Sequence, residues 1–169
     1  MARCEPVELD YLDRAPFRFT ASELVNATPE RVFEIFQDAV AWTKWVQVIK
    51  KVEWTSPFPL GVGSTRTVHM AGGLRGDETF IAWEPNERMA FRFDELSVPV
   101  GSAQLLSAFA EDYRVTDVRL GQSRVDWTLC MTPSGAGAVT ARPAKPLMAF
   151  EIRRTLKRFA RYVDATSRR

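Results

Sequence analysis

The last part of the sequence carries a long amphipathic helix pattern, and this pattern restricts how the rest of the chain can pack. Apolar side chains recur at steps of four, four, three and four residues, at Met148, Ile152, Leu156, Phe159 and Val163. This spacing places them on one face of a helix, which we expect to run from near Pro146 to about Thr166. Such a face needs a second apolar surface to cover it.

Most of the preceding chain has the pattern of short strands. We expect strands over 17–25, 46–54, 63–70, 77–84, 88–95, 105–118 and 123–131. Gly, Pro and Asn mark most of the connections, with a longer connection at 96–104 and a flexible linker at 134–139. Strands joined mainly by short connections favour an antiparallel sheet.

Two short helices interrupt the strands near the start of the chain. Thr28 is a good N-cap residue, and Pro29 suits the first helical position of the segment that follows. The segment around Trp42 and Trp45 is predicted to form the second helix. These elements predict an α+β fold in which a curved sheet of about seven strands packs on the long C-terminal helix. We expect an apolar pocket between them.

Length and composition fit one domain over residues 16–169, preceded by a flexible leader over 1–15. The net charge of +2 is too small to indicate nucleic-acid binding. The start of the chain lacks the apolar core of a signal peptide, and no stretch has the ~18 apolar residues of a membrane span. We therefore expect a cytoplasmic protein with no integral membrane segment. Cys4 and Cys130 give no disulfide framework.

Four segments carry a resemblance to a known family. They are ATPERVFEIFQDAVAWTKWV, GVGSTRTV, AWEPNERMAFRF and DYRVTDVRLGQSRVDWTLCM. In this order the chain resembles the START/Bet v 1-like (SRPBCC) superfamily over about residues 17–166, and within it bacterial polyketide cyclase/dehydrase-type proteins. The resemblance implies a helix-grip fold with a cavity under the long helix. Members of the superfamily include lipid carriers, hormone and quinone binders, and cyclases, so the fold alone does not fix a function.

The strand at 105–118 supplies the best candidates for polar groups in the pocket. Its bulkier face, which we place inward, carries Glu111 and Tyr113 among apolar residues. A buried Glu111 would have a raised pKa and could act as a general acid or base, with Tyr113 as a hydrogen-bond donor to a ligand oxygen. Alternatively, Glu111 is solvated near a strand end or paired with an arginine. His69, the only histidine, is expected to point away from the core.

The expected ligand contacts combine this pair with aromatic and aliphatic side chains. They are Phe91, Phe93, Phe109, Glu111, Tyr113, Trp127, Leu129 and Phe150. The first hypothesis is a module that binds a hydrophobic small molecule such as a lipid, a quinone or a polyketide-like compound. The alternatives are a polyketide cyclase/dehydrase-type enzyme that uses Glu111 and Tyr113, or a protein-interaction module that uses the basic residues of the last helix. We expect no metal and no cofactor, and leave a homodimer open.

Overall fold

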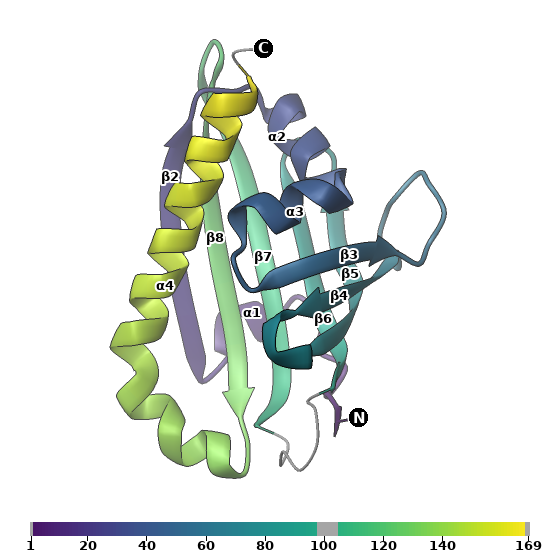
Figure 1. Cartoon of the computed structure of the whole chain (residues 1–169), viewed down its shortest axis with the longest axis vertical. Coiled ribbons are helices and arrows are strands. Elements are labelled where there is room, and N and C mark those ends of the chain that lie inside the picture. The colour runs from purple at the N-terminus through teal and green to yellow at the C-terminus, as the bar shows by residue number, and fades with distance from the viewer. Residues whose placement is uncertain (1, 98–104, 168–169) are drawn as a thin grey trace.

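An antiparallel sheet forms the body of the computed structural model, which describes residues 2–97 and 105–167 (Figure 1). The strands are β1 (Ala2–Arg3), β2 (Phe17–Val25), β3 (Ile49–Trp54), β4 (Thr65–Met70), β5 (Arg75–Glu84), β6 (Arg88–Ser97), β7 (Leu106–Arg119) and β8 (Gln122–Pro133). Their order is β2-β8-β7-β6-β5-β4-β3, and the short β1 pairs with β6. The predicted antiparallel sheet is therefore confirmed. The connection expected at 96–104 lies largely outside the described residues.

Helices cover the concave face of this sheet (Figure 1). They are α2 (Pro29–Gln37), α3 (Ala39–Trp45) and α4 (Ala136–Thr166), with a short 3₁₀ turn, η1 (Ala71–Gly73), and a short helix α1 (Tyr11–Arg14) elsewhere. The side chain of Thr28 accepts a hydrogen bond from the Arg31 N–H at the start of α2, as the capping pattern predicts. Asp38 ends α2 and caps α3 by accepting from the Val40 N–H. The helix-grip architecture is confirmed.

The long helix α4 begins earlier than the sequence pattern predicts. We expected a flexible linker at 134–139 and a helix from near Pro146, but α4 starts at Ala136 and contains both Pro143 and Pro146. Proline lacks the N–H that an inner helical turn requires, so it usually marks a boundary or a bend. Figure 1 shows that this first part of α4 bends away from the axis of the remainder.

The segment that we expected to be a flexible leader contacts the sheet at two places, beside Cys4 and at α1. The N–H of Cys4 donates to the Asp94 carbonyl, next to the β1–β6 pair. Tyr11 and Leu12 of α1 are buried against the convex face, and the Tyr11 hydroxyl lies 2.9 Å from the Thr132 Oγ1. The small side chains on this face, such as Ala110, leave room for the helix. No helix in the described ranges is long and apolar enough to cross a membrane.

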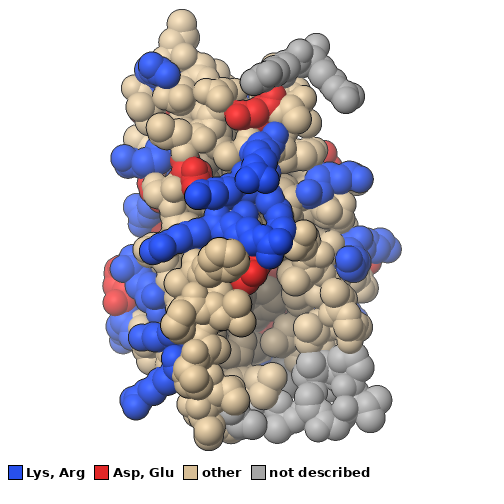
Figure 2. Space-filling view, turned by 60° about the vertical axis from the view of Figure 1, so that its left-hand side comes forward, with Lys and Arg blue, Asp and Glu red and all other residues tan. Residues whose placement is uncertain are grey.

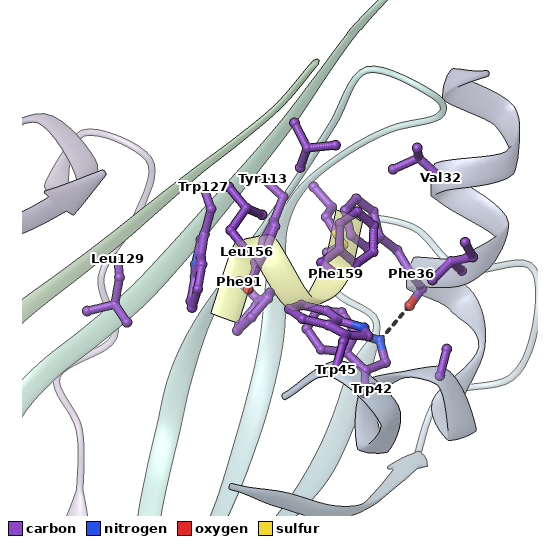
Figure 3. Close-up of a cluster of buried hydrophobic side chains, with 14 of the residues drawn as sticks. Val32, Phe36, Trp42, Trp45, Phe91, Tyr113, Trp127, Leu129, Leu156 and Phe159 are labelled. Atoms are coloured by element: carbon purple, nitrogen blue, oxygen red, sulfur yellow. Dashed lines mark hydrogen bonds between the residues drawn. The ribbon is translucent and has the colours of Figure 1, made fainter. Parts of the chain in front are cut away.

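Aromatic rings fill one end of the interior, under α2 and α3 (Figure 3). Phe36 of α2 stacks on Phe159 of α4 with ring centroids 5.3 Å apart, and Trp45 of α3 meets Phe159 at 4.9 Å. The indole N–H of Trp42 donates to the Phe36 carbonyl at 2.8 Å and ties α3 to α2. This cluster fixes α4 across the sheet and closes that end of the interior.

Candidate functional site

A cavity of about 440 Å³ lies between the sheet and the middle of α4. Most of its lining is apolar, and it includes Val68, Phe93, Phe109, Leu129, Met148 and Ile152. This volume falls in the range of sites that enclose small organic molecules. Trp42 of the aromatic cluster borders the cavity on the side of α3.

The structure brings most of the predicted contact residues to this cavity. Those that line it are Phe91, Phe93, Phe109, Glu111, Tyr113, Trp127 and Leu129, although their contact with a ligand stays a prediction. Phe150 does not line it, since its side chain is 59% exposed. Successive helical residues turn by about 100°, so Phe150 points away from the face that Met148 and Ile152 share. The expected place of Phe150 in the pocket is therefore wrong.

Glu111 is held at the cavity wall by two neighbouring side chains. Its Oε2 accepts a hydrogen bond from the Tyr113 hydroxyl at 2.8 Å and another from the Trp127 indole N–H at 2.9 Å. Tyr113 lies two residues after Glu111 on β7. Trp127 is its partner on β8, and the two rings stack with their centroids 5.4 Å apart. The carboxyl is thus oriented by the pleat of two adjacent strands.

Arg66 and Glu78 also line the cavity, and the sequence reasoning missed both. Arg66 Nε lies 2.5 Å from Glu78 Oε2, and their side chains are only 1% and 3% exposed. The guanidinium lies 4.2 Å from the ring centre of Trp42 and 4.5 Å from that of Phe91. Arg66 has the same strand parity as Val68, so the alternation of β4 already placed it on the inner face.

Burial and charge together raise the pKa of the Glu111 carboxyl from its ordinary 4.5 to about 7. Burial is the main cause and the nearby charge of Glu78 adds to it, while the hydrogen bond from Tyr113, the charge of Arg66 and the bond from Trp127 oppose it. Part of the Glu111 surface remains accessible from the cavity. Burial also holds the pKa of Tyr113 well above its usual value, so this phenol keeps its proton near neutral pH.

The mouth of the cavity is bordered by charged residues of α4. Glu151 and Arg158 line it. Figure 2 shows Lys and Arg side chains gathered on this face beside a hollow, with an acidic group at the edge of the hollow. On α4 the exposed basic residues include Arg154, Lys157 and Arg161. Arg154 is held by Glu151, with an N–O distance of 3.3 Å.

The remaining candidates from the sequence lie elsewhere. His69 projects from β4 toward solvent, where its Nε2 lies 2.8 Å from Glu53 Oε2. Cys4 and Cys130 are buried and free. Within residues 2–97 and 105–167, no cluster of three or more His, Cys, Asp or Glu side chains has an arrangement that could hold a metal ion. A second hollow, of about 690 Å³, lies beside the start of α2 and the ends of β5, β6 and β7, and is bordered largely by polar and charged side chains such as Glu87 and Arg114.

Comparison with family profiles places this chain in a described group. The profile of the family described as "Polyketide cyclase / dehydrase and lipid transport" matches residues 16–164. The chain belongs to this family. The expected resemblance to START/Bet v 1-like SRPBCC proteins, and to the polyketide cyclase/dehydrase type among them, is confirmed. An uncharacterized protein of Mycobacterium tuberculosis is 45% identical over 98% of this chain and 95% of its own length.

Solved structures share the fold of this family member at low identity. The Zhui aromatase/cyclase from Streptomyces sp. R1128 has a TM-score of 0.65 and 14% identity, covering 90% of this chain and 94% of its own. A START superfamily protein from Mycobacterium smegmatis has a TM-score of 0.64 and 12% identity, covering 88% of this chain and 95% of its own. At these identities the comparison establishes the architecture and carries no residue roles.

Proposed function

We propose that this chain binds a hydrophobic small molecule, of the lipid, quinone or polyketide-like kind, in the cavity between the sheet and α4. The observation that carries the proposal is a mostly apolar cavity of about 440 Å³, with polar side chains from the sheet on its wall and from α4 at its mouth. Ligand sites of this size combine apolar walls with a small number of orienting polar groups. The description of the family, which includes lipid transport, agrees with this role.

Native mass spectrometry of the purified protein tests the proposal. We expect a co-purified apolar compound, or an apolar compound from a broad panel that binds and raises the melting temperature. Met148→Trp, which places a larger ring in the cavity, should remove this binding. Leu147→Trp adds the same ring one position earlier, where the side chain is 63% exposed, and should leave binding intact. The proposal fails if no apolar compound binds or if both variants behave alike.

A polyketide cyclase/dehydrase-type enzyme is the second candidate, and the Glu111 carboxyl favours it. A carboxyl with a pKa of about 7 can exchange a proton with a bound substrate near neutral pH. The Tyr113 hydroxyl donates its hydrogen bond to Glu111, so the geometry supports a positioning role for Tyr113 rather than a hydrogen bond to an enolate-like oxygen. The shared fold with an aromatase/cyclase is consistent with this candidate.

The substitution Glu111→Gln separates catalysis from binding. In an enzyme that uses Glu111 as acid or base, this variant loses turnover of a polyketide-like substrate by about 100-fold or more and retains substrate affinity within a few-fold. Unchanged turnover would remove Glu111 from the mechanism. If the natural protein binds the substrate but does not convert it, only the first proposal, the binding function, stands.

A further inference from the structure

The two oxygens of the Glu111 carboxyl differ in their hydrogen bonds. Oε2 accepts from Tyr113 and from Trp127, and a carboxyl oxygen has two lone pairs. A proton bound to Glu111 therefore belongs on Oε1, from which it can be donated toward the cavity. The single O–H of Tyr113 is already engaged in its hydrogen bond to Glu111, so protonated Glu111 is the donor that this pair offers a ligand.

The charges around Glu111 favour its protonated form when the cavity is filled. Arg66 on β4 and Glu78 on β5 form a contact pair, so their opposite charges offset each other. At the mouth, Glu151 and Arg158 from α4 are also opposite in sign. An ionised Glu111 would thus add a negative charge that no direct partner balances in the described part of the site. An apolar ligand that displaces water would make that charge costlier still.

Arg66 supplies a second donor on the same wall. Its Nε is engaged by Glu78, but its Nη1 is buried without a hydrogen-bond partner. The rings of Trp42 and Phe91 hold the guanidinium plane in place. A buried donor that lacks an acceptor destabilises the empty protein, and an acceptor brought by a ligand would relieve this.

From these two donors we infer that the ligand carries an uncharged carbonyl oxygen, which accepts hydrogen bonds from Arg66 and from Glu111 in its protonated form. The inference rests on the proposed binding function and specifies the chemical class of its ligand. A carboxylate would bring a second negative charge beside Glu78, and a cation would approach Arg66. A pure hydrocarbon would leave both donors without an acceptor.

Three naphthalene derivatives of similar shape test this inference by calorimetric titration of the full-length protein. Acetylnaphthalene carries the carbonyl, isopropenylnaphthalene replaces its oxygen by carbon, and naphthoate carries a charge. At pH 6 we expect the ketone to bind at least about tenfold more tightly than either of the others. Between pH 6 and pH 8 its affinity should fall about tenfold, because only the protonated protein binds it. Titrations in buffers of different ionisation enthalpy at pH 8 should show proton uptake.

Variants at Glu111 connect these effects to one side chain. Glu111→Gln retains a donor but does not titrate, so the ketone should bind with an affinity that no longer falls between pH 6 and pH 8. Glu111→Met removes the donor and should abolish most of the preference for the ketone over the hydrocarbon. Glu53→Gln changes an exposed carboxyl outside the cavity and should keep the pH dependence. Thermal unfolding verifies that each variant is folded. If Glu111→Met does not fold, the pH dependence of ketone binding in Glu111→Gln is enough to test the role of Glu111.

Each contrary result separates the inference from the binding function. Equal affinity for the ketone and the hydrocarbon at pH 6 would overturn the carbonyl class and leave the binding function standing. Tighter binding of naphthoate would overturn it in favour of an anionic ligand. If the ketone affinity of Glu111→Gln falls with pH as much as that of the natural protein, Glu111 does not cause the pH dependence, and its proposed hydrogen bond to the ligand is overturned. If none of these compounds and no other apolar compound binds, the proposed function fails as well.

Discussion

Arg66 and Glu78 form an ion pair on adjacent strands at the cavity wall, with Nε and Oε2 2.5 Å apart and both side chains almost fully buried. Arginine keeps its charge in proteins, so this position needs a negative partner. The pair places a fixed charge under aromatic rings, beside the carboxyl of Glu111. On the sheet, the charged side chains of the cavity lining therefore come from three strands, β4, β5 and β7.

Removing one partner of this pair should be far more harmful than removing both. Glu78→Leu leaves the buried Arg66 without a counter-charge and should lower the free energy of unfolding by about 3–5 kcal/mol. The double variant Arg66→Met with Glu78→Leu should recover most of that loss. Urea unfolding of the two variants measures both values. A double variant as unstable as the single one would show that packing, and not charge compensation, dominates here.

The hydrogen bond from Trp127 should lower the pKa of Glu111, because it stabilises the ionised carboxyl. Trp127→Phe removes the donor, and the pKa of Glu111 should rise above its present value of about 7. A carbon-13 NMR titration of the Glu111 carboxyl gives the midpoint directly. Trp83→Phe changes a partly buried indole of the aromatic cluster and serves as the matched control. An unchanged midpoint in Trp127→Phe would mean that this bond does not influence the titration.

Glu111 should also make the stability of the protein depend on pH. Its pKa is higher in the folded protein than in the unfolded chain, so the folded state binds the proton more tightly. The resulting stabilisation is complete below about pH 4.5 and is lost as the pH rises through about 7. It amounts to at most about 3 kcal/mol, and less because the side chain meets water in the cavity.

The difference in unfolding free energy between the natural protein and Glu111→Gln isolates this effect. Other titrating groups contribute similarly to both, so the natural protein should lose stability relative to the variant between pH 4.5 and pH 7. Urea unfolding at a series of pH values measures the difference. A constant difference across this range would show that Glu111 does not titrate there.

Gly76 should be intolerant of even a methyl group. A Cβ at this position would lie 2.3 Å from Cε1 of Phe93, which forms part of the cavity wall. Gly76→Ala should displace the ring, cost about 1–3 kcal/mol of stability and weaken ligand binding. Gly61→Ala is the control, because nothing lies within 4 Å of a Cβ there. Thermal unfolding and ligand titration compare the two, and equal behaviour would exclude a wall role for this contact.

Strand alternation predicted the most informative part of the site. The parity of the strand at 105–118 correctly placed Glu111 and Tyr113 toward the interior, because the apolar side chains of that face must be covered. The same rule applied to β4 and β5 puts Arg66 with Val68 and Glu78 with Phe80. A charged residue that shares a strand face with apolar residues thus indicates a polar group on the cavity wall. Arg66 and Glu78 carry this signal although neither belongs to a catalytic motif.

Other features depended on contacts that local sequence does not encode. Helix α4 starts at Ala136 although Pro143 and Pro146 follow, and prolines usually indicate a helix boundary. The leader folds because Tyr11 and Leu12 find small side chains on a distant surface of the sheet. Phe150, in contrast, could have been excluded from the cavity by helical phase alone. Neither the cavity volume nor the bonds of Glu111 could be read from periodicity.

The most direct test of the central claim is where a bound apolar compound lies. Methyl-labelled protein in complex with acetylnaphthalene, or with a co-purified compound, should give intermolecular nuclear Overhauser effects to the methyl groups of Leu129, Met148 and Ile152. All three line the cavity, whereas Leu147 on the outside of α4 should give none. Effects confined to exposed methyl groups such as Leu147, with none from the three cavity residues, would contradict the claim that this fold encloses its ligand.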